Sequence, residues 1–284
     1  MFPGFFQRAL LGAFVFLHAF GAASADAQRI DIPNFWNNQD RFIKPDTSSV
    51  VRLRFLTTTD FPPFNFIDDQ RRLVGFHVDL ARAICAELEL SAICQIQALP
   101  FSDLEKTLKD GKGEAILAGL AITSKSRERL AFSRAYFRLP AKFIARQDSD
   151  LKEPMAEFLR DKKLGVVTGT AHAAYAQKFF PGADVKLFAD EGKAIASLEK
   201  SEIEAVFSSG LSLSNALHRG AAAKCCKFVG GPYLSPFYFG HGMAIALRLE
   251  DEVLRDAINF ALHAINEKGT FAELYLRYFP VGIF

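Results

Sequence analysis

The amino-acid sequence predicts an α/β protein built as two lobes, each with a mostly parallel sheet flanked by helices. Short apolar runs of strand length alternate with amphipathic helical segments, first between residues 51 and 146 and again between residues 164 and 247. A length of 284 residues is long for one domain and sufficient for two hydrophobic cores. Two such lobes in one chain predict a ligand cleft between them, lined by loops at the carboxyl ends of strands.

Composition and charge exclude several kinds of partner. The formal net charge is +2 and the chain has no run of lysine or arginine, so we expect no binding to nucleic acid. The four cysteines show neither CxxC nor Cys/His spacing, so the sequence predicts no metal site and no cofactor. The 29 phenylalanines suit both apolar lobes and an aromatic-lined cleft, without distinguishing the two.

The first 27 residues predict an export signal that is cleaved. Arg8 supplies the positive charge, residues 9–20 form the apolar segment, and Ala23-Ser24-Ala25 or Ala25-Asp26-Ala27 provides the cleavage site. A membrane anchor is the alternative reading, but the apolar run is shorter than the ~20 residues that span a bilayer, and no basic cluster follows it. No cysteine lies near the cleavage site, so we expect no lipid anchor.

The elements of the first lobe follow an N-terminal extension at residues 28–50. The extension holds the only tryptophan, Trp36, lacks clear periodicity, and is expected to pack across the surface of a lobe. Apolar runs and helical spacing predict strands at 51–57, 92–96, 115–117 and 142–146, with helices at 75–90 and 102–111. Ser102-Asp103-Leu104-Glu105 has the pattern of a capping box that begins the second of these helices.

The second half of the chain repeats this plan on a smaller scale. The predicted strands are 164–167, 185–188, 204–207, 226–229 and 243–247, and the predicted helices are 171–179, 191–200 and 210–217. A long amphipathic helix then covers residues 253–265, and Thr270 is expected to cap a last short helix that ends at Pro280.

The export signal makes the cysteines interpretable, because disulfides persist outside the cytoplasm. Cys85 and Cys94 bracket the end of one helix and the start of the next strand, and these ends lie close in a strand-helix-strand unit, so we predict a bond between them. Cys225 and Cys226 are adjacent. A bond between neighbours is strained, which favours two free buried thiols over a vicinal disulfide.

The segment from residue 114 to residue 137 is the first candidate for ligand binding. A short buried strand leads to Gly119, where a backbone can be approached closely, and then to Thr123, a good N-cap before a charged helical turn. Free N–H groups and the positive end of a helix dipole suit an anion or a carboxylate, although an ordinary strand-to-helix turn has the same pattern. The loops after residues 57, 117, 167 and 207, and the loop that carries Phe101, complete the expected cleft.

Six motifs, in this order, resemble one family of proteins. They are DFPPFNF (60–66), GFHVDLARAI (75–84), AGLAITSKSRERLAFS (118–133), VTGTAH (167–172), EAVFSS (204–209) and KGTFAELYLRYFP (268–280). Each motif alone is weak. Together, after an export signal and over residues 51–280, they resemble the bacterial extracellular solute-binding proteins of family 3, the polar-amino-acid-binding class of ABC transporters.

The resemblance implies a two-lobe periplasmic binding protein of type II with two hinge crossings, near residues 146–150 and 239–242. Lobe 1 is then 51–146 with 241–284, and lobe 2 is 147–240. The implied protein is a periplasmic monomer, not an enzyme. It captures a small polar solute, an amino acid or an amino-acid-like or organic acid, and delivers it to an ABC permease in the inner membrane. The resemblance also supports the pairing of Cys85 with Cys94, since some members carry a disulfide there.

The resemblance places eight residues in the ligand site, namely Phe61, Phe101, Gly119, Ala121, Thr123, Arg127, Thr170 and Ser209. Phe61 and Phe101 correspond to two aromatic walls, and Gly119 to the glycine whose backbone contacts the ligand amine. Thr170 corresponds to the residue of the second lobe that meets the carboxylate. Ala121 stands where members usually have serine or threonine, so one hydroxyl is lost.

Two further departures alter the expected grip on an α-amino acid. Ser126 stands where the family usually has an arginine that holds the carboxylate, and Arg127 follows one step, about 100°, around the helix. Ser209 stands where an aspartate usually takes the ammonium group. Either another pair, such as Arg127 with Asp60, replaces the missing groups, or the solute is not an ordinary α-amino acid, because a buried ammonium without a carboxylate is costly.

Two other functions use the same fold. One is a partner-binding accessory or sensor protein, for which the extension around Trp36 is the only support. The other is an enzyme similar to cyclohexadienyl dehydratases, which needs an acid or a base at the cleft. His172 is the only well-placed histidine for that role.

Overall fold

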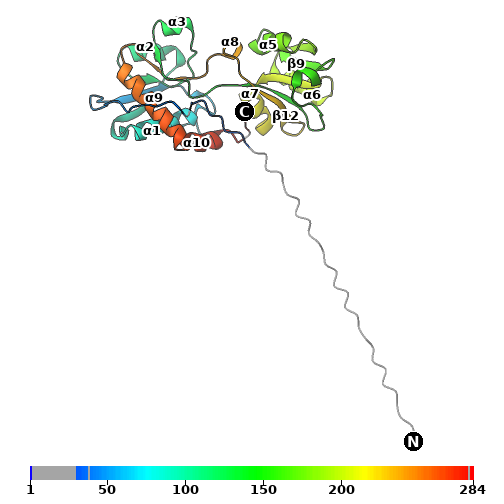
Figure 1. Ribbon diagram of the computed structural model, residues 1–284, viewed down its shortest axis with the longest axis horizontal. Coiled ribbons are helices and arrows are strands. Elements are labelled where there is room, and N and C mark those ends of the chain that lie inside the picture. The colour runs from blue at the N-terminus through cyan, green and yellow to red at the C-terminus, as the bar shows by residue number, and fades with distance from the viewer. Residues whose placement is uncertain (2–29, 38, 281) are drawn as a thin grey trace.

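The computed structural model describes residue 1 and residues 30–37, 39–280 and 282–284. Apart from its first residue, the predicted export signal lies outside these residues. Figure 1 shows two α/β lobes side by side, with α1, α9 and α10 on one and α5, α6 and α7 on the other. The predicted two-lobe α/β fold is confirmed. None of the helices in the described part of the chain is long and apolar enough to span a bilayer.

The sheet of the first lobe has five strands in the order β5-β1-β6-β13-β7. Their bounds are β1 Leu53–Thr57, β5 Cys94–Ala98, β6 Ala115–Ile116, β7 Ala131–Phe132 and β13 Ala246–Leu247. Strand β1 runs parallel to β5 and β6, whereas β13 is antiparallel to β6 and β7. A small antiparallel sheet precedes α1 and consists of β2 Asp60–Phe61, β3 Asn65–Ile67 and β4 Leu73–Val74.

Helices cover both faces of the first sheet. They are α1 Phe76–Glu87, α2 Leu104–Lys109, α3 Ser124–Arg127, α9 Glu252–Glu267 and α10 Thr270–Tyr278, with 3-10 turns η1 Ser91–Ile93 and η2 Phe101–Asp103. Because side chains alternate along a strand, Leu53 and Phe55 pack in the cluster with α1, α9 and α10, and Leu56 packs in the opposite cluster with α2. The sheet is therefore buried on both faces, which suits parallel strands.

The second sheet has the order β10-β9-β11-β8-β12. Its strands are β8 Ala141–Arg146, β9 Lys163–Val167, β10 Asp184–Phe188, β11 Ala205–Ser209 and β12 Cys226–Tyr233. The helices of this lobe are α4 Met155–Phe158, α5 Ala171–Phe179, α6 Glu191–Glu199, α7 Gly210–Arg219 and α8 Pro236–Phe239, with the 3-10 turn η3 Ala221–Ala223. The C-terminal ends of the parallel strands β9 and β11 lie at one edge of the sheet, so the loops after them can meet.

Strand β8 corrects the predicted boundary between the lobes. Its residues were expected in the first lobe, but β8 pairs antiparallel with β11 and β12 of the second sheet. The first crossing therefore comes before Ala141, not at residues 146–150. The chain returns to the first lobe after α8, since Met243 forms a bridge with Phe137. A strand that is buried on both faces fits either sheet, and only its pairing partners show which sheet it joins.

The extension packs on the first lobe, as predicted. Trp36 is 7% exposed and belongs to the core cluster of that lobe. Its ring contacts Phe42 and His263 edge to face, with centroids 5.7 and 5.8 Å away. Arg134 reaches back over the Phe42 ring and forms an ion pair with Asp40.

Two predicted caps are wrong. Ser102 does not cap α2; its hydroxyl donates to Asp103 Oδ1 within η2, the 3-10 turn that precedes the helix. The residue before α10 is Gly269, which has a φ of 79°, so Thr270 is already inside the helix. A short 3-10 turn also delays β5 to Cys94, two residues later than predicted.

The cysteines give one confirmation and one correction. The predicted bond between Cys85 and Cys94 is present and joins the end of α1 to the start of β5. Cys225 and Cys226 are also bonded, so the expectation of two free thiols is wrong. The N–H and the side-chain amide of Gln147 donate to the carbonyl oxygens of Cys225 and Cys226, both at 2.8 Å. These bonds hold the two neighbouring residues at the start of β12.

Candidate functional site

The hairpin of β2 and β3 carries the first aromatic of the predicted site. Phe61 stacks on the fully buried Phe64, with ring centroids 4.8 Å apart. The Phe61 ring also lies against Gly119, where a Cβ atom would come within 2.9 Å of it. The structure therefore brings Phe61 and Gly119, two of the predicted site residues, into contact.

A buried network of hydrogen bonds connects this hairpin to α1 and to Tyr136. The Asn65 amide donates to the Thr58 hydroxyl (2.7 Å) and to its carbonyl oxygen (3.1 Å). The side-chain oxygen of Asn65, Oδ1, lies 2.7 Å from His77 Nδ1, and His77 Nε2 lies 2.7 Å from the Tyr136 hydroxyl. Burial lowers the pKa of His77 to about 3, so the imidazole is neutral. Nδ1 then donates to the amide oxygen and Nε2 accepts from the tyrosine.

Sequence reasoning assigned His77 only to a helix and missed this network. The signal was present in part: Asn65 and His77 are polar residues within apolar stretches, where buried polar groups need partners. Spacing alone could not show that the two would meet, nor that Tyr136 would complete the chain.

We expect Gly119→Ala to destabilise the protein by about 1 kcal/mol more than Gly169→Ala. Both glycines have a φ of +71°, so both variants carry a similar backbone penalty. Only at Gly119 does the new methyl group press on Phe61, whereas none of the described residues lies within 4 Å of the corresponding atom at Gly169. Urea denaturation of the two variants measures the difference, and equal losses would show that Phe61 yields freely.

The loop after Gly119 ends in a capping box formed by Thr123 and Ser126. Ser126 stands where the family usually has an arginine, and the capping box uses its side chain. Thr123 Oγ1 accepts from the Ser126 N–H (3.0 Å), and Ser126 Oγ accepts from the Thr123 N–H (2.9 Å). Ser126 also donates to the Ala121 carbonyl oxygen at 2.9 Å and is buried. Its hydroxyl therefore holds the loop together and is not offered to a ligand.

Arg127 does not replace the missing arginine in this structure. Its guanidinium lies over the Phe132 ring, 5.9 Å from the centroid, on the edge strand β7. Among the described residues Arg127 forms no ion pair with Asp60. The two groups that were expected to substitute for the clamp are therefore not joined.

Asp60 instead shares a pocket with Phe101. The pocket measures about 260 Å³ and lies where β1 and β5 end; its lining residues are Thr58, Thr59, Asp60, Ala98, Leu99, Pro100 and Phe101. Phe101 is 57% exposed, so its ring is available to a ligand. A carboxylate beside an exposed aromatic ring suits a cation, because both attract positive charge.

The second lobe contributes two loop ends at the same sheet edge. Thr170 caps α5: its hydroxyl accepts from the Ala173 N–H (3.2 Å) and donates to the Val167 carbonyl oxygen (2.8 Å). Ser209 precedes α7 without a side-chain cap. Across the described residues, no hydrogen bond or ring contact joins either residue to the first-lobe set.

Glu191 is an acidic residue beside Ser209 that sequence reasoning missed. Its carboxylate accepts from the hydroxyls of Ser208 and Ser212, the second at 2.6 Å. These serines lie on either side of Ser209, at the end of β11 and in the first turn of α7. Position 209, where the family usually has an aspartate, is a serine here, but α6 supplies the Glu191 carboxylate close to it in the fold.

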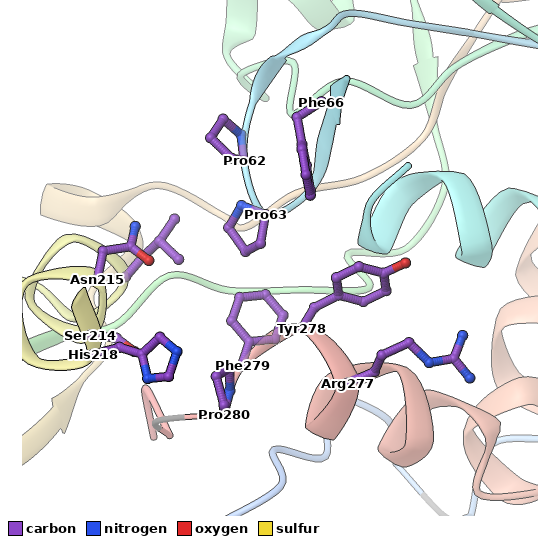
Figure 2. Close-up of a pocket in the computed structure, with 11 residues that line it drawn as sticks. Pro62, Pro63, Phe66, Ser214, Asn215, His218, Arg277, Tyr278, Phe279 and Pro280 are labelled. Carbon is purple, nitrogen blue, oxygen red and sulfur yellow. The ribbon is translucent and has the colours of Figure 1, made fainter. Parts of the chain in front are cut away.

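A further pocket of about 470 Å³ lies between the lobes. Pro62, Pro63 and Phe66 of the hairpin and Phe279 of α10's end face Asn215 and His218 of α7 across it (Figure 2). None of the eight predicted site residues lines this pocket. The loops that are predicted to face the ligand and this pocket are therefore separate features of the structure.

Comparison with known proteins agrees with this architecture. The family model of the bacterial extracellular solute-binding proteins, family 3, matches residues 53–281. An arginine-binding periplasmic protein of Mannheimia haemolytica is 33% identical over 215 residues, which covers 76% of this chain and 86% of that protein. The lysine/arginine/ornithine-binding periplasmic protein of Escherichia coli (strain K12) is 29% identical over 234 residues, covering 82% and 89%.

Solved structures show the same fold. The second substrate binding domain of a putative amino acid ABC transporter from Streptococcus pneumoniae superposes with a TM-score of 0.68 at 21% identity, covering 80% of this chain and 100% of that one. The family model spans most of the chain, and the matched segments include both sheets. The chain belongs to the bacterial extracellular solute-binding proteins, family 3.

Proposed function

We propose that this protein captures a small polar solute between its lobes and delivers it to an ABC permease of the inner membrane. Family membership and relatives that are named periplasmic amino-acid-binding proteins support this role. We also propose that residues 1–27 direct export and are cleaved, and that the mature chain acts as a monomer in the periplasm without enzymatic activity. Hinge rotation would close the lobes, with the bound solute favouring the closed state.

We infer that the solute carries a cationic group. The observation that carries this inference is the pocket where Asp60 lies beside the exposed ring of Phe101. Relatives named for arginine, lysine, ornithine and histidine support a basic amino acid or a related amine.

The carboxylate of an amino acid would meet fewer hydrogen-bond donors in this protein than the family usually provides. Ser126 is occupied by the capping box, and Arg127 lies over Phe132. The Thr170 hydroxyl is also used within its own loop. We therefore propose that the positive group, and not the carboxylate, supplies most of the binding free energy, with Glu191 available to an ammonium group near Ser209.

Agmatine, which is arginine without its carboxylate, tests this proposal directly. We expect isothermal titration calorimetry to give dissociation constants for agmatine and L-arginine within about threefold of each other, a difference below 1 kcal/mol. L-glutamate serves as the control without a cationic side chain. Binding of L-arginine with no binding of agmatine would show that a carboxylate clamp exists after all. Failure of every amine and amino acid to bind would contradict the solute-binding role itself.

The two alternative functions lose their main support. The Trp36 ring is buried in the first lobe, so it is not available as a partner-binding surface. The His172 imidazole stacks on Phe239, 5.0 Å between centroids, and burial lowers its pKa. Among the described residues it has no acidic or basic hydrogen-bond partner, as an activated catalytic base would.

A further inference from the structure

Lys142 is a buried lysine at the boundary between the lobes. It is the second residue of β8 in the second sheet and is only 7% exposed. Its ammonium donates to the main-chain oxygen of Phe284 at 3.1 Å and lies 4.4 Å from the centre of the Phe228 ring. In the described part of the chain no aspartate or glutamate side chain lies within ion-pair distance of it. A lysine buried in this way needs its few polar contacts, because an unpaired buried charge is costly.

The segment that Lys142 binds is anchored on the other lobe. Ile283 is completely buried in the core cluster of the first lobe, and its N–H donates to the Tyr275 hydroxyl at 3.1 Å. The Phe284 ring packs on Phe35 of the extension, with centroids 5.5 Å apart. In Figure 1 the end of the chain marked C lies beside α7, between the two lobes. Residues 282–284 therefore reach from the first lobe to a side chain of the second.

The N-terminal extension covers the same segment. Ile30 lies 3.2 Å from the position that a Cβ atom would take at Gly282, so the two stretches are in close contact. Burial lowers the pKa of Lys142, and the negative charge of Asp31 in the extension opposes this shift. The extension thus packs on the segment that Lys142 binds, and its Asp31 lies close enough to influence the Lys142 ammonium.

The first residue of α7, Gly210, allows the segment 282–284 to lie close to the second lobe. A Cβ atom at Gly210 would lie 3.1 Å from the carbonyl oxygens of both Ile283 and Pro140. Beside it, the lobes leave the 470 Å³ pocket between α7 and the Pro62-Pro63 turn (Figure 2). Direct packing between the lobes is therefore incomplete here, and the segment 282–284 bridges them next to an open space.

We propose that residues 30–36 and 282–284 form a strap that ties the first lobe to Lys142 and restrains rotation of the lobes about the two crossings. Lys142 is a positioning residue for the angle between the lobes and does not touch the solute. The N-terminal extension, which contributes no residue to the proposed ligand site, would then limit the rotation of the lobes. The proposal does not depend on which solute the protein binds.

The test measures the distance between the lobes in the absence of solute. Spectroscopic labels on unnatural amino acids at the exposed positions 109 and 178 report on lobe 1 and lobe 2, without new cysteines near the disulfides. In Lys142→Met the side chain keeps an apolar stem but loses the ammonium, and with it the hydrogen bond to Phe284 and the contact of the ammonium with the Phe228 ring. We expect the fraction of molecules whose distance between the labels lies outside the main wild-type distance to rise about tenfold, which corresponds to about 1.4 kcal/mol. Lys200→Met, an exposed lysine of the same lobe, is the matched control and should leave the distribution unchanged.

A second variant weakens the strap from the other side. Phe35→Ala removes the contact with the Phe284 ring without altering the second lobe. It should broaden the same distance distribution, while circular dichroism confirms that both variants are folded. Unchanged distributions in folded Lys142→Met and Phe35→Ala would overturn the strap. A lowered melting temperature with an unchanged distribution would show that these residues only stabilise the first lobe, which also contradicts the proposal.

Discussion

His77→Phe is expected to lower the free energy of unfolding by about 4 kcal/mol. The substitution keeps a ring of similar size but leaves the Asn65 amide oxygen and the Tyr136 hydroxyl without their partner in a buried site. Each buried polar group without a partner costs about 1–3 kcal/mol. Denaturant unfolding measures the loss.

A double-mutant cycle distinguishes the network from simple packing. Tyr136→Phe removes the hydroxyl, so in the variant with both changes one of the unpaired groups no longer exists. The combined loss should be smaller than the sum of the two single losses by about 1 kcal/mol or more. Strictly additive losses would mean that His77 and Tyr136 do not depend on one another.

The pH dependence of stability gives an independent readout of the same histidine. In the unfolded chain a histidine takes up a proton below a pKa of about 6.5, whereas burial keeps the pKa of folded His77 at about 3. The unfolded state therefore binds more protons between these values, and stability falls as the pH decreases. From pH 6.5 to pH 5 the loss is about 2 kcal/mol. The slope should become shallower in His77→Phe, which leaves the contribution of His172, whose pKa is also lowered by burial. A wild-type stability that stays flat over this interval would contradict a neutral buried imidazole.

Asp60→Asn is expected to weaken binding of L-arginine and agmatine by about 30-fold, or about 2 kcal/mol. The amide keeps the shape of the side chain but removes the negative charge beside Phe101. The loss should be similar for both ligands, because both carry the guanidinium that Asp60 is proposed to attract. Calorimetric titration of both ligands measures it.

Asp69→Asn is the matched control for that experiment. Asp69 is an exposed aspartate in the turn between β3 and β4 of the same small sheet, and it does not line the pocket. Its replacement makes the same change in net charge without touching the proposed contact. Equal weakening in both variants would point to a general electrostatic effect, and full affinity in Asp60→Asn would remove Asp60 from the site.

The sequence by itself determined those features that depend on near neighbours in the chain. Apolar periodicity located the longer strands and helices of both lobes, because burial of one face follows from spacing, but it missed the two- and three-residue strands β2, β3, β4 and β7. The Thr123 cap and the close approach at Gly119 also follow from local chemistry, and both are present. The bond between Cys85 and Cys94 was within reach for the same reason: a helix and the next strand bring their ends together over nine residues.

Only the tertiary structure decided which distant groups meet. Strand β8 is buried on both faces, so its pattern fits either sheet, and its hydrogen-bond partners alone place it in the second. A single step around a helix sends Arg127 toward Phe132, and the capping box takes Ser126 into the loop. The His77 network and the contact of Lys142 with Phe284 join residues more than 50 and 140 positions apart. Local pattern encodes how far each side chain is buried, but not the partner it meets there, because that partner is set by how the lobes and the strap pack together.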